Sequence, residues 1–356
     1  MSAETMTWLN TNTLVGFAAK RGTAWHYRPA EQGAESNHYD GAIPVDDVVR
    51  RLFHWEAVSA PVAVLIPCDL TDERMTGIGA DGRPFRLVID EDRQAMVRDD
   101  NDFVMGVFKQ GYRGHAYRQW LIGNVSNLLD GDLSIGSAGL LRGGAVAWVQ
   151  VERPDTLVTP SGVEIRPHLL ASTSFDGSLA TGYRAALTNT VCDNTMAVAI
   201  TEADAAGKVF RVAHTKYSNL KIAAARDALD IVFEAGDAFT AEIERMTNTP
   251  VTDDQFDRII ATFFDDDKAE TERAKTIAAN RTAALHNLWT NDIRVQPWAG
   301  TSWGAFQAFN TWAQHVQTVR GATHRFDRNM DAAVTGKAAK FDAAVLATIK
   351  GVLTPA

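Results

Sequence analysis

The hydrophobic repeat of this chain changes near residue 216 from that of strands to that of helices, and this change limits the possible folds more than any other feature. Before it, short apolar runs are separated by Gly, Pro, Asn and Asp, a pattern typical of β-hairpins. After it, apolar residues recur three or four positions apart among Ala, Glu, Lys and Arg. We therefore expect an α+β protein with a hairpin-rich antiparallel sheet and packed helices in residues 1–215, and a mostly helical region in residues 216–356.

Two hairpins and two helices are predicted in the first region. Apolar runs over 62–66 and 85–89 flank an Asp81-Gly82 turn, and residues 133–151 fold back at Gly143-Gly144. Helical spacing over 44–53 and 117–130 indicates helices, the first with Pro44 in its first turn. Turns at 160–162 and 176–177 are expected to separate further short strands, which are followed by the segments 189–200 and 208–212.

The second region has the periodicity of several long helices. They are predicted over 218–245, 253–264, 268–289, 303–320 and 337–353. The acidic run at 265–267 reads more simply as a solvated turn than as a cation site.

The composition excludes several classes of protein. Of 356 residues 46% are hydrophobic and 22% charged, as in a folded globular chain, and neither a secretory leader nor a run of about 18 apolar residues is present. The two cysteines, Cys68 and Cys192, allow neither a disulfide framework nor a zinc finger. A net charge of −9 argues against a protein that coats duplex DNA by charge. We expect a cytoplasmic protein that does not enter a membrane.

Catalytic motifs are weak in this sequence. The GxGxxG match over 77–82 is followed by Pro84 and a strand, where a dinucleotide fold needs a helix. Cys192, Asp193 and His214 are the ingredients of a thiol nucleophile with its base, but a lone cysteine of this kind is more often part of the core. We therefore expect no catalytic residue, no metal ligand and no cofactor.

A segment rich in cations and aromatic residues, 109–120, is the most suggestive of function. Cations neutralise phosphates and aromatic faces stack on unpaired bases, which is how single-stranded nucleic acid is held. A second such stretch follows at 211–226. The candidate DNA-binding residues are Lys109, Tyr112, Arg113, Tyr117, Arg118, Trp120, Lys216 and Lys221. In the simpler interpretation, Tyr117 and Trp120 face the core and the cations are merely solvated.

Several short motifs occur in an order that resembles a known family. They are Val97-Arg-Asp through Tyr112, the segments at 137–144, 174–178, 190–195 and 213–215, the Gly300-Thr-Ser-Trp-Gly-Ala-Phe-Gln-Ala308 run with Gln314-His315, and the opening 22–26. Together they resemble the phage/plasmid-like proteins of the domain of unknown function 932 family. The resemblance implies a mobile genetic element in a bacterial host cell, and no particular activity.

Three hypotheses follow. The first is a single-stranded DNA binding and annealing protein that works as a homo-oligomer, by analogy of fold with the ring-forming annealing proteins. The second is a non-catalytic interaction or regulatory protein of a mobile element, and the third is a thiol enzyme built on Cys192 and His214. A groove lined by the predicted cations would favour the first, a large apolar surface the second, and a cleft joining Cys192 to His214 the third.

Overall fold

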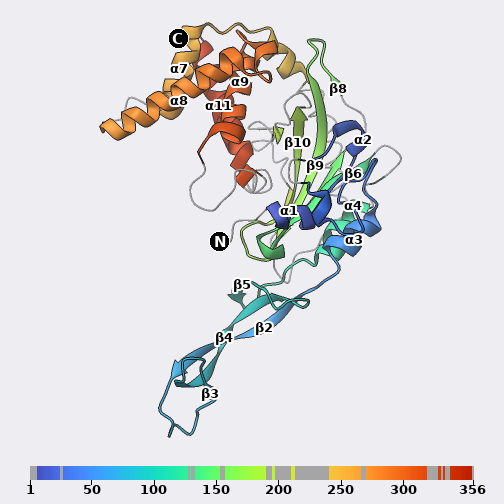
Figure 1. The fold of residues 1–356 in the computed structure, drawn as a ribbon, viewed down its shortest axis with the longest axis vertical. Coiled ribbons are helices and arrows are strands. Elements are labelled where there is room, and N and C mark those ends of the chain that lie inside the picture. Colours follow the sequence, from blue (N-terminus) through green and yellow to red (C-terminus); the bar gives the residue numbers. More distant parts are fainter. Residues whose placement is uncertain are drawn as a thin grey trace.

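The computed structural model describes most of the chain. The described residues are 6–24, 27–126, 129, 133–152, 157–189, 195–196, 210–212, 240–265, 270–318, 328–329, 332 and 337–354. Within them, antiparallel sheets occupy the first part of the chain and helices dominate the last part (Figure 1). The protein is therefore of the α+β class, as the change of hydrophobic repeat predicts.

The central sheet is antiparallel throughout. Its strand order is β1 (Thr13–Val15), β6 (Ser134–Leu141), β7 (Val146–Glu152), β9 (Glu164–Ser174), β10 (Thr181–Asn189) and β11 (Thr195–Met196), with β8 (Leu157–Val158) beside β9 and β12 (Phe210–Val212) beside β10. The predicted hairpin at Gly143-Gly144 is confirmed: both glycines have positive φ, 68° and 100°, which side chains disfavour, and the pair joins β6 to β7. Of the strand predicted over 208–212, residues 210–212 are described and form β12.

Short helices cover one part of this sheet. They are α1 (Met6–Asn12), α2 (Ala18–Arg21), the 3-10 turn η1 (Pro29–Glu31) and α3 (Val45–Leu52). In α3, Asp46 and Asp47 lie in the first turn and Arg50 and Arg51 in the last, so that the charges oppose the helix dipole, while Val48 and Leu52 are buried. The helix predicted over 44–53 is thus confirmed.

The helix predicted over 117–130 is only partly right. The chain forms a π-helical turn, η2 (Arg118–Ile122), and then the single α-turn α4 (Gly123–Ser126). The ring of Trp120 is 1% exposed and belongs to the main core, so burial of this side chain, more than regular helical hydrogen bonding, holds the segment in place.

Among its described residues, the helical part contains the longer helices α7 (Asp253–Phe264), α8 (Glu272–Asn291), α9 (Ser302–Thr311) and α11 (Lys337–Leu353). A capping box at Thr252 and Gln255 begins α7 at the predicted residue. The helix predicted over 303–320 ends early, because α9 passes into a π-helical turn, η6 (Trp312–Val316). Of the helix predicted over 218–245, residues 240–247 are described and helical.

The helices form their own hydrophobic core, which also takes in one end of the sheet. Buried aromatic side chains of α7 and α9, Phe256, Phe306 and Phe309 among them, pack at its centre. Val163 and Ile165, at the start of β9, are fully buried in the same cluster. The helical part is therefore packed against the start of β9.

A long hairpin projects from the body (Figure 1). It consists of β2 (Ala57–Pro67) and β4 (Pro84–Arg98), with β3 (Gly77–Ile78) beside β4 at the tip and β5 (Val104–Lys109) beside β4 at the base. The hairpin predicted over 62–66 and 85–89 is confirmed, and it extends well beyond those residues. We call residues 57–98 the arm.

Candidate functional site

The arm has two faces of different chemistry. In the outer half of the arm, Val62 lies opposite Asp90, and Leu65 opposite Leu87. Opposed residues of an antiparallel pair share a face, and successive residues alternate between faces. We call one face the apolar face; it consists of Ala63, Leu65, Pro67, Phe85, Leu87 and Ile89. The opposite face carries Val62, Val64, Ile66, Arg86, Val88 and Asp90.

The apolar face is open to solvent in the described chain. Leu65 is 58% exposed, Leu87 44% and Ile89 61%, although these are side chains that proteins normally bury. A two-stranded ribbon has no second layer beneath it, so nothing in the arm itself can cover both faces. Contiguous exposed apolar surface of this kind marks interaction sites in folded proteins. The arm is therefore the leading candidate for a functional surface.

Buried polar contacts hold the base of the arm to the body. The Gln94 Nε2 amide donates to the carbonyls of Lys109, Gln110 and Tyr112, at 3.4, 3.3 and 2.8 Å. Arg98, 6% exposed, lies over the Trp55 ring. These contacts fix where the arm leaves the sheet.

Arg98 is itself held by charge and by the backbone. Its Nη1 donates to the Gly143 carbonyl at 3.0 Å. Its Nε and Nη2 donate to Oδ1 and Oδ2 of Asp100, at 2.8 and 2.6 Å. The hydrogen bonds from Arg98 hold the pKa of Asp100 below its usual value. The base of the arm is thus tied to the β6–β7 turn. Sequence reasoning missed Gln94 and Arg98, since only the fold brings their partners close.

Three of the predicted DNA-binding residues lie at the surface near this base. Lys109 and Arg113 are exposed, and neither makes an ion pair with a described carboxylate. Arg118 is also exposed, but its Nη2 is already engaged, because it donates to the Phe53 carbonyl at 3.2 Å. These cations gather near one end of the arm and do not line a groove among the described residues.

Tyr112 lies between surface and core. Its ring stacks on Phe108, with centroids 3.9 Å apart and planes 9° apart, and its hydroxyl donates to the Ser174 carbonyl at 3.2 Å. Burial, aided by the charge of Asp176, raises the pKa of Tyr112 above its usual value. One face of the ring is therefore already covered by the protein.

Tyr117 and Trp120 are in the core, which corrects the expectation that they offer stacking faces. Tyr117 is 4% exposed, its hydroxyl donates to the Gly144 carbonyl at 2.8 Å, and its ring lies 4.5 Å from that of Phe175. Trp120 is nearly inaccessible. The two rings help to fill the hydrophobic core near the junction of arm and sheet, where aromatic side chains bury large apolar areas.

The remaining predicted residues lie outside the part of the chain that the structure describes. They are Lys216 and Lys221 of the second cationic stretch, and Cys192, Asp193 and His214 of the thiol hypothesis. Among the described residues, no three His, Cys, Asp or Glu side chains are grouped as metal ligands would be. No described helix has the length and apolar character needed to cross a bilayer.

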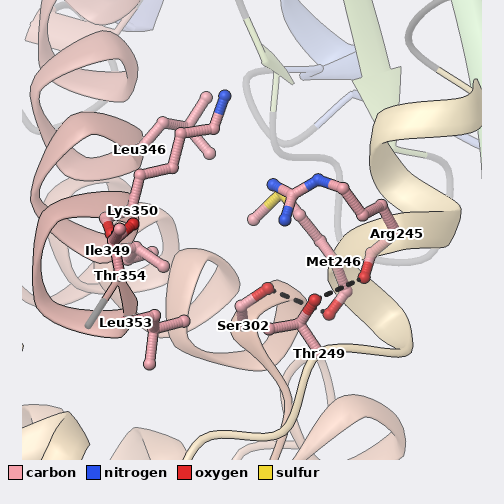
Figure 2. A pocket seen from close by; sticks show the side chains of 9 residues that line it. All are labelled: Arg245, Met246, Thr249, Ser302, Leu346, Ile349, Lys350, Leu353 and Thr354. Carbon is pink, nitrogen blue, oxygen red and sulfur yellow. Dashed lines mark hydrogen bonds between the residues drawn. The ribbon is translucent and has the colours of Figure 1, made fainter.

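Figure 2 shows a pocket of about 170 Å³ in the helical part. Its lining residues are Arg245, Met246, Thr249, Ser302, Leu346, Ile349, Lys350, Leu353 and Thr354. The Thr249 hydroxyl donates to the Arg245 carbonyl, and the Ser302 hydroxyl donates to the Met246 carbonyl. The two cations of the lining, Arg245 and Lys350, both form ion pairs with Glu242. Ligand pockets are usually about 300–1,000 Å³ with free polar groups. We therefore assign no ligand to this pocket.

Comparison with known proteins places the chain in a family. No curated protein and no solved structure matches it significantly. A family model described as a domain of unknown function (DUF932) matches residues 104–334, more than half of the chain. The match begins at β5, so strands β2, β3 and β4 of the arm precede it. The chain belongs to the DUF932 family.

Proposed function

We propose that this chain is a non-catalytic interaction protein that binds another protein through its arm. The observation that carries the proposal is the exposed apolar face, in which Leu65, Leu87 and Ile89 are each more than two-fifths exposed. Burying apolar surface is the main driving force of protein association, worth about 25 cal/mol per Å² before its costs are subtracted. Binding of a partner that covers the apolar face would therefore be favoured by the burial of these side chains.

The shape and charge of the arm favour a protein partner over a nucleic acid. Between Ala57 and Arg98 the sequence has seven acidic and five basic residues, so the arm does not attract phosphates. A two-stranded ribbon also lacks the concave form of a small-molecule site. Extended protein segments, by contrast, recognise strand edges and apolar sheet faces.

Photo-crosslinking tests the proposal in producing cells. We expect a photoreactive phenylalanine analogue at Leu87 to give a covalent protein adduct, because that position lies within the buried contact. The same analogue at Ile293, which is 83% exposed in a turn remote in sequence from the arm, is the matched control and should give none. Equal labelling at Leu87 and Ile293 would contradict a partner on the apolar face. So would the absence of an adduct when the analogue is placed at Leu87 or, in a second variant, at Ile89.

Single-stranded DNA binding is a second candidate, favoured by one observation. Lys109 and Arg113 lie exposed on either side of Tyr112, whose ring stacks on Phe108. Cations beside aromatic rings are the usual means of holding unpaired nucleotides. In this second candidate function, the protein anneals single strands and works as a homo-oligomer. It would belong to a mobile genetic element and act in the bacterial cytoplasm. Cell fractionation tests the location.

A salt series separates this candidate from the first. Replacing Lys109 and Arg113 together by alanine should reduce the log–log slope of oligonucleotide affinity against salt by about 1.4, since each lost phosphate contact removes about 0.7. Arg74→Ala with Arg83→Ala is the matched control, because these tip cations already pair with Asp72 and Asp81. If the unmodified protein shows neither micromolar binding at low salt nor a preference for single strands over duplex, the candidate fails.

A further inference from the structure

Carboxylates lie near both ends of the apolar face along the arm. One pair, Glu91 and Asp92, falls in a bulge of β4, among residues that have no partner on β2. The other pair, Asp69 and Glu73, belongs to the loop 68–76 that joins β2 to β3 at the tip. All four residues are exposed, and their side chains make no ion pair or hydrogen bond within the described part of the chain. Their charges are therefore available to a partner.

The cations of the arm are already neutralised, in contrast to these carboxylates. The ion pairs are Arg74–Asp72, Arg83–Asp81, Arg93–Asp90 and, at the base, Arg98–Asp100. The remaining arginine between Ala57 and Arg98, Arg86, lies on the face opposite to Leu65 and Leu87. The apolar face thus carries no cation and is bracketed along the arm by negative charge.

This charge pattern limits what can cover the apolar face. Carboxylates repel both a bilayer surface rich in anionic lipid and the phosphates of a nucleic acid. Two copies of the face packed on each other would bring the carboxylates of one arm close to those of the other, and like charges opposed across an interface weaken it. A protein segment that carries cations gains from the apolar face and from the charges around it.

We propose that the apolar face docks a cationic amphipathic segment of another protein, in which apolar side chains are flanked at both ends by Lys or Arg. This inference rests on the proposed function and states the chemistry of the partner. The apolar side chains of the segment cover Leu65, Leu87 and Ile89. Its flanking cations pair with the carboxylates of the bulge and of the tip loop.

The length of the face sets the length of the segment. On β4 the face runs from Phe85 to Ile89, which is about 14 Å at about 3.4 Å per residue. An α-helix covers this distance with about ten residues, because it rises about 1.5 Å per residue. So short a segment buries less surface than a standard interface of roughly 1,200–2,000 Å². We therefore expect micromolar binding that depends on salt.

Fluorescence anisotropy with two synthetic peptides and the full chain tests the charge of the partner. Both peptides form an amphipathic helix with leucines on one side; the first has two lysines at each end, the second two glutamates. We expect the lysine peptide to bind about tenfold more tightly at low salt, and the difference to shrink as salt screens the exposed charges. Equal binding of the two peptides, or a preference that salt does not change, would overturn the inference.

Neutralising the carboxylates of the bulge distinguishes a local contact from general attraction to an acidic protein. Glu91→Gln with Asp92→Asn should weaken binding of the lysine peptide about three- to tenfold, as expected for the loss of two exposed ion pairs. The matched control is Asp40→Asn with Glu270→Gln, which removes the same charge from two exposed residues remote in sequence from the arm and should leave the affinity unchanged. Equal affinities of the two double variants would contradict docking beside the bulge.

The photoreactive analogue at Leu87 separates this inference from the proposed function. Digestion of the adduct at acidic residues leaves Lys and Arg uncleaved, so that mass spectrometry identifies the attached segment with its cations. We expect Lys or Arg on both sides of its apolar residues. An adduct with an acidic or uncharged segment would refute the cationic partner and leave the proposed function standing. An adduct with a second copy of this chain, or no adduct at all, would refute both.

Discussion

Replacing Arg21 by methionine should lower the free energy of unfolding by about 3–5 kcal/mol, because it leaves a buried carboxylate without its cation. The Glu152 side chain has no exposed surface, and its Oε1 lies 2.5 Å from Nη1 of Arg21. Its other oxygen accepts from the Gln150 amide at 3.1 Å. Gly136 makes room for the carboxylate, since a Cβ there would lie 1.5 Å from Oε1. The site is thus built around this charge.

Urea denaturation followed by tryptophan fluorescence measures the loss. Arg93→Met is the matched control, because Arg93 and Asp90 are exposed and 3.6 Å apart, and such pairs contribute about 0–1 kcal/mol. The double variant Arg21→Met, Glu152→Leu should recover most of the stability, since it removes the unpaired charge as well. A single variant that unfolds at the urea concentration of the unmodified protein would show that Glu152 does not depend on Arg21.

The second large effect is a loss of stability in mild acid caused by His168. This side chain is 1% exposed in β9, and burial lowers its pKa from 6.5 to about 4. Between these values the unfolded chain binds a proton that the folded chain does not, so stability falls as the pH falls. The slope is about 1.4 kcal/mol per pH unit, or roughly 3 kcal/mol over the whole window.

His168→Gln should remove this part of the pH dependence, because glutamine does not titrate. The measurement is the free energy of unfolding at several pH values from 7 to 4, compared between the variant and the unmodified protein. His54→Gln, at a side chain that is 53% exposed, serves as the control for the substitution itself. Parallel curves for His168→Gln and the unmodified protein would mean that His168 is protonated equally in both states.

The elements that could be predicted from the sequence are those fixed by local signals. Helix α7 begins at its capping box and α11 has the predicted bounds, since both depend on residues within one or two turns. The hairpin turn at Gly143-Gly144 is equally local, because glycine tolerates a positive φ. Such signals need no knowledge of the remaining chain.

The features that could not be predicted depend on contacts between distant residues. The spacing of Trp120 with its apolar neighbours is helical, but its burial against the sheet produces a π-helical turn instead. Gln94 and Arg98 look like ordinary strand residues until the fold brings their carbonyl partners within reach. The apolar runs at 62–66 and 85–89 correctly predict a hairpin, but they do not indicate that both faces of its outer part stay open to solvent, because that depends on what the remaining chain packs against.

The place of the arm in the chain has a consequence for how relatives can diverge. Thr13 of β1 pairs with Gly139 of β6, and the arm lies wholly within the chain between these two neighbours in the sheet. Lengthening an excursion between paired strands costs little, because loop-closure entropy grows only with the logarithm of length. Insertions of whole residue pairs near the tip would extend the hairpin and keep its faces in phase. Selection can therefore adjust the reach of the arm as a spacer while the core sequence stays constant.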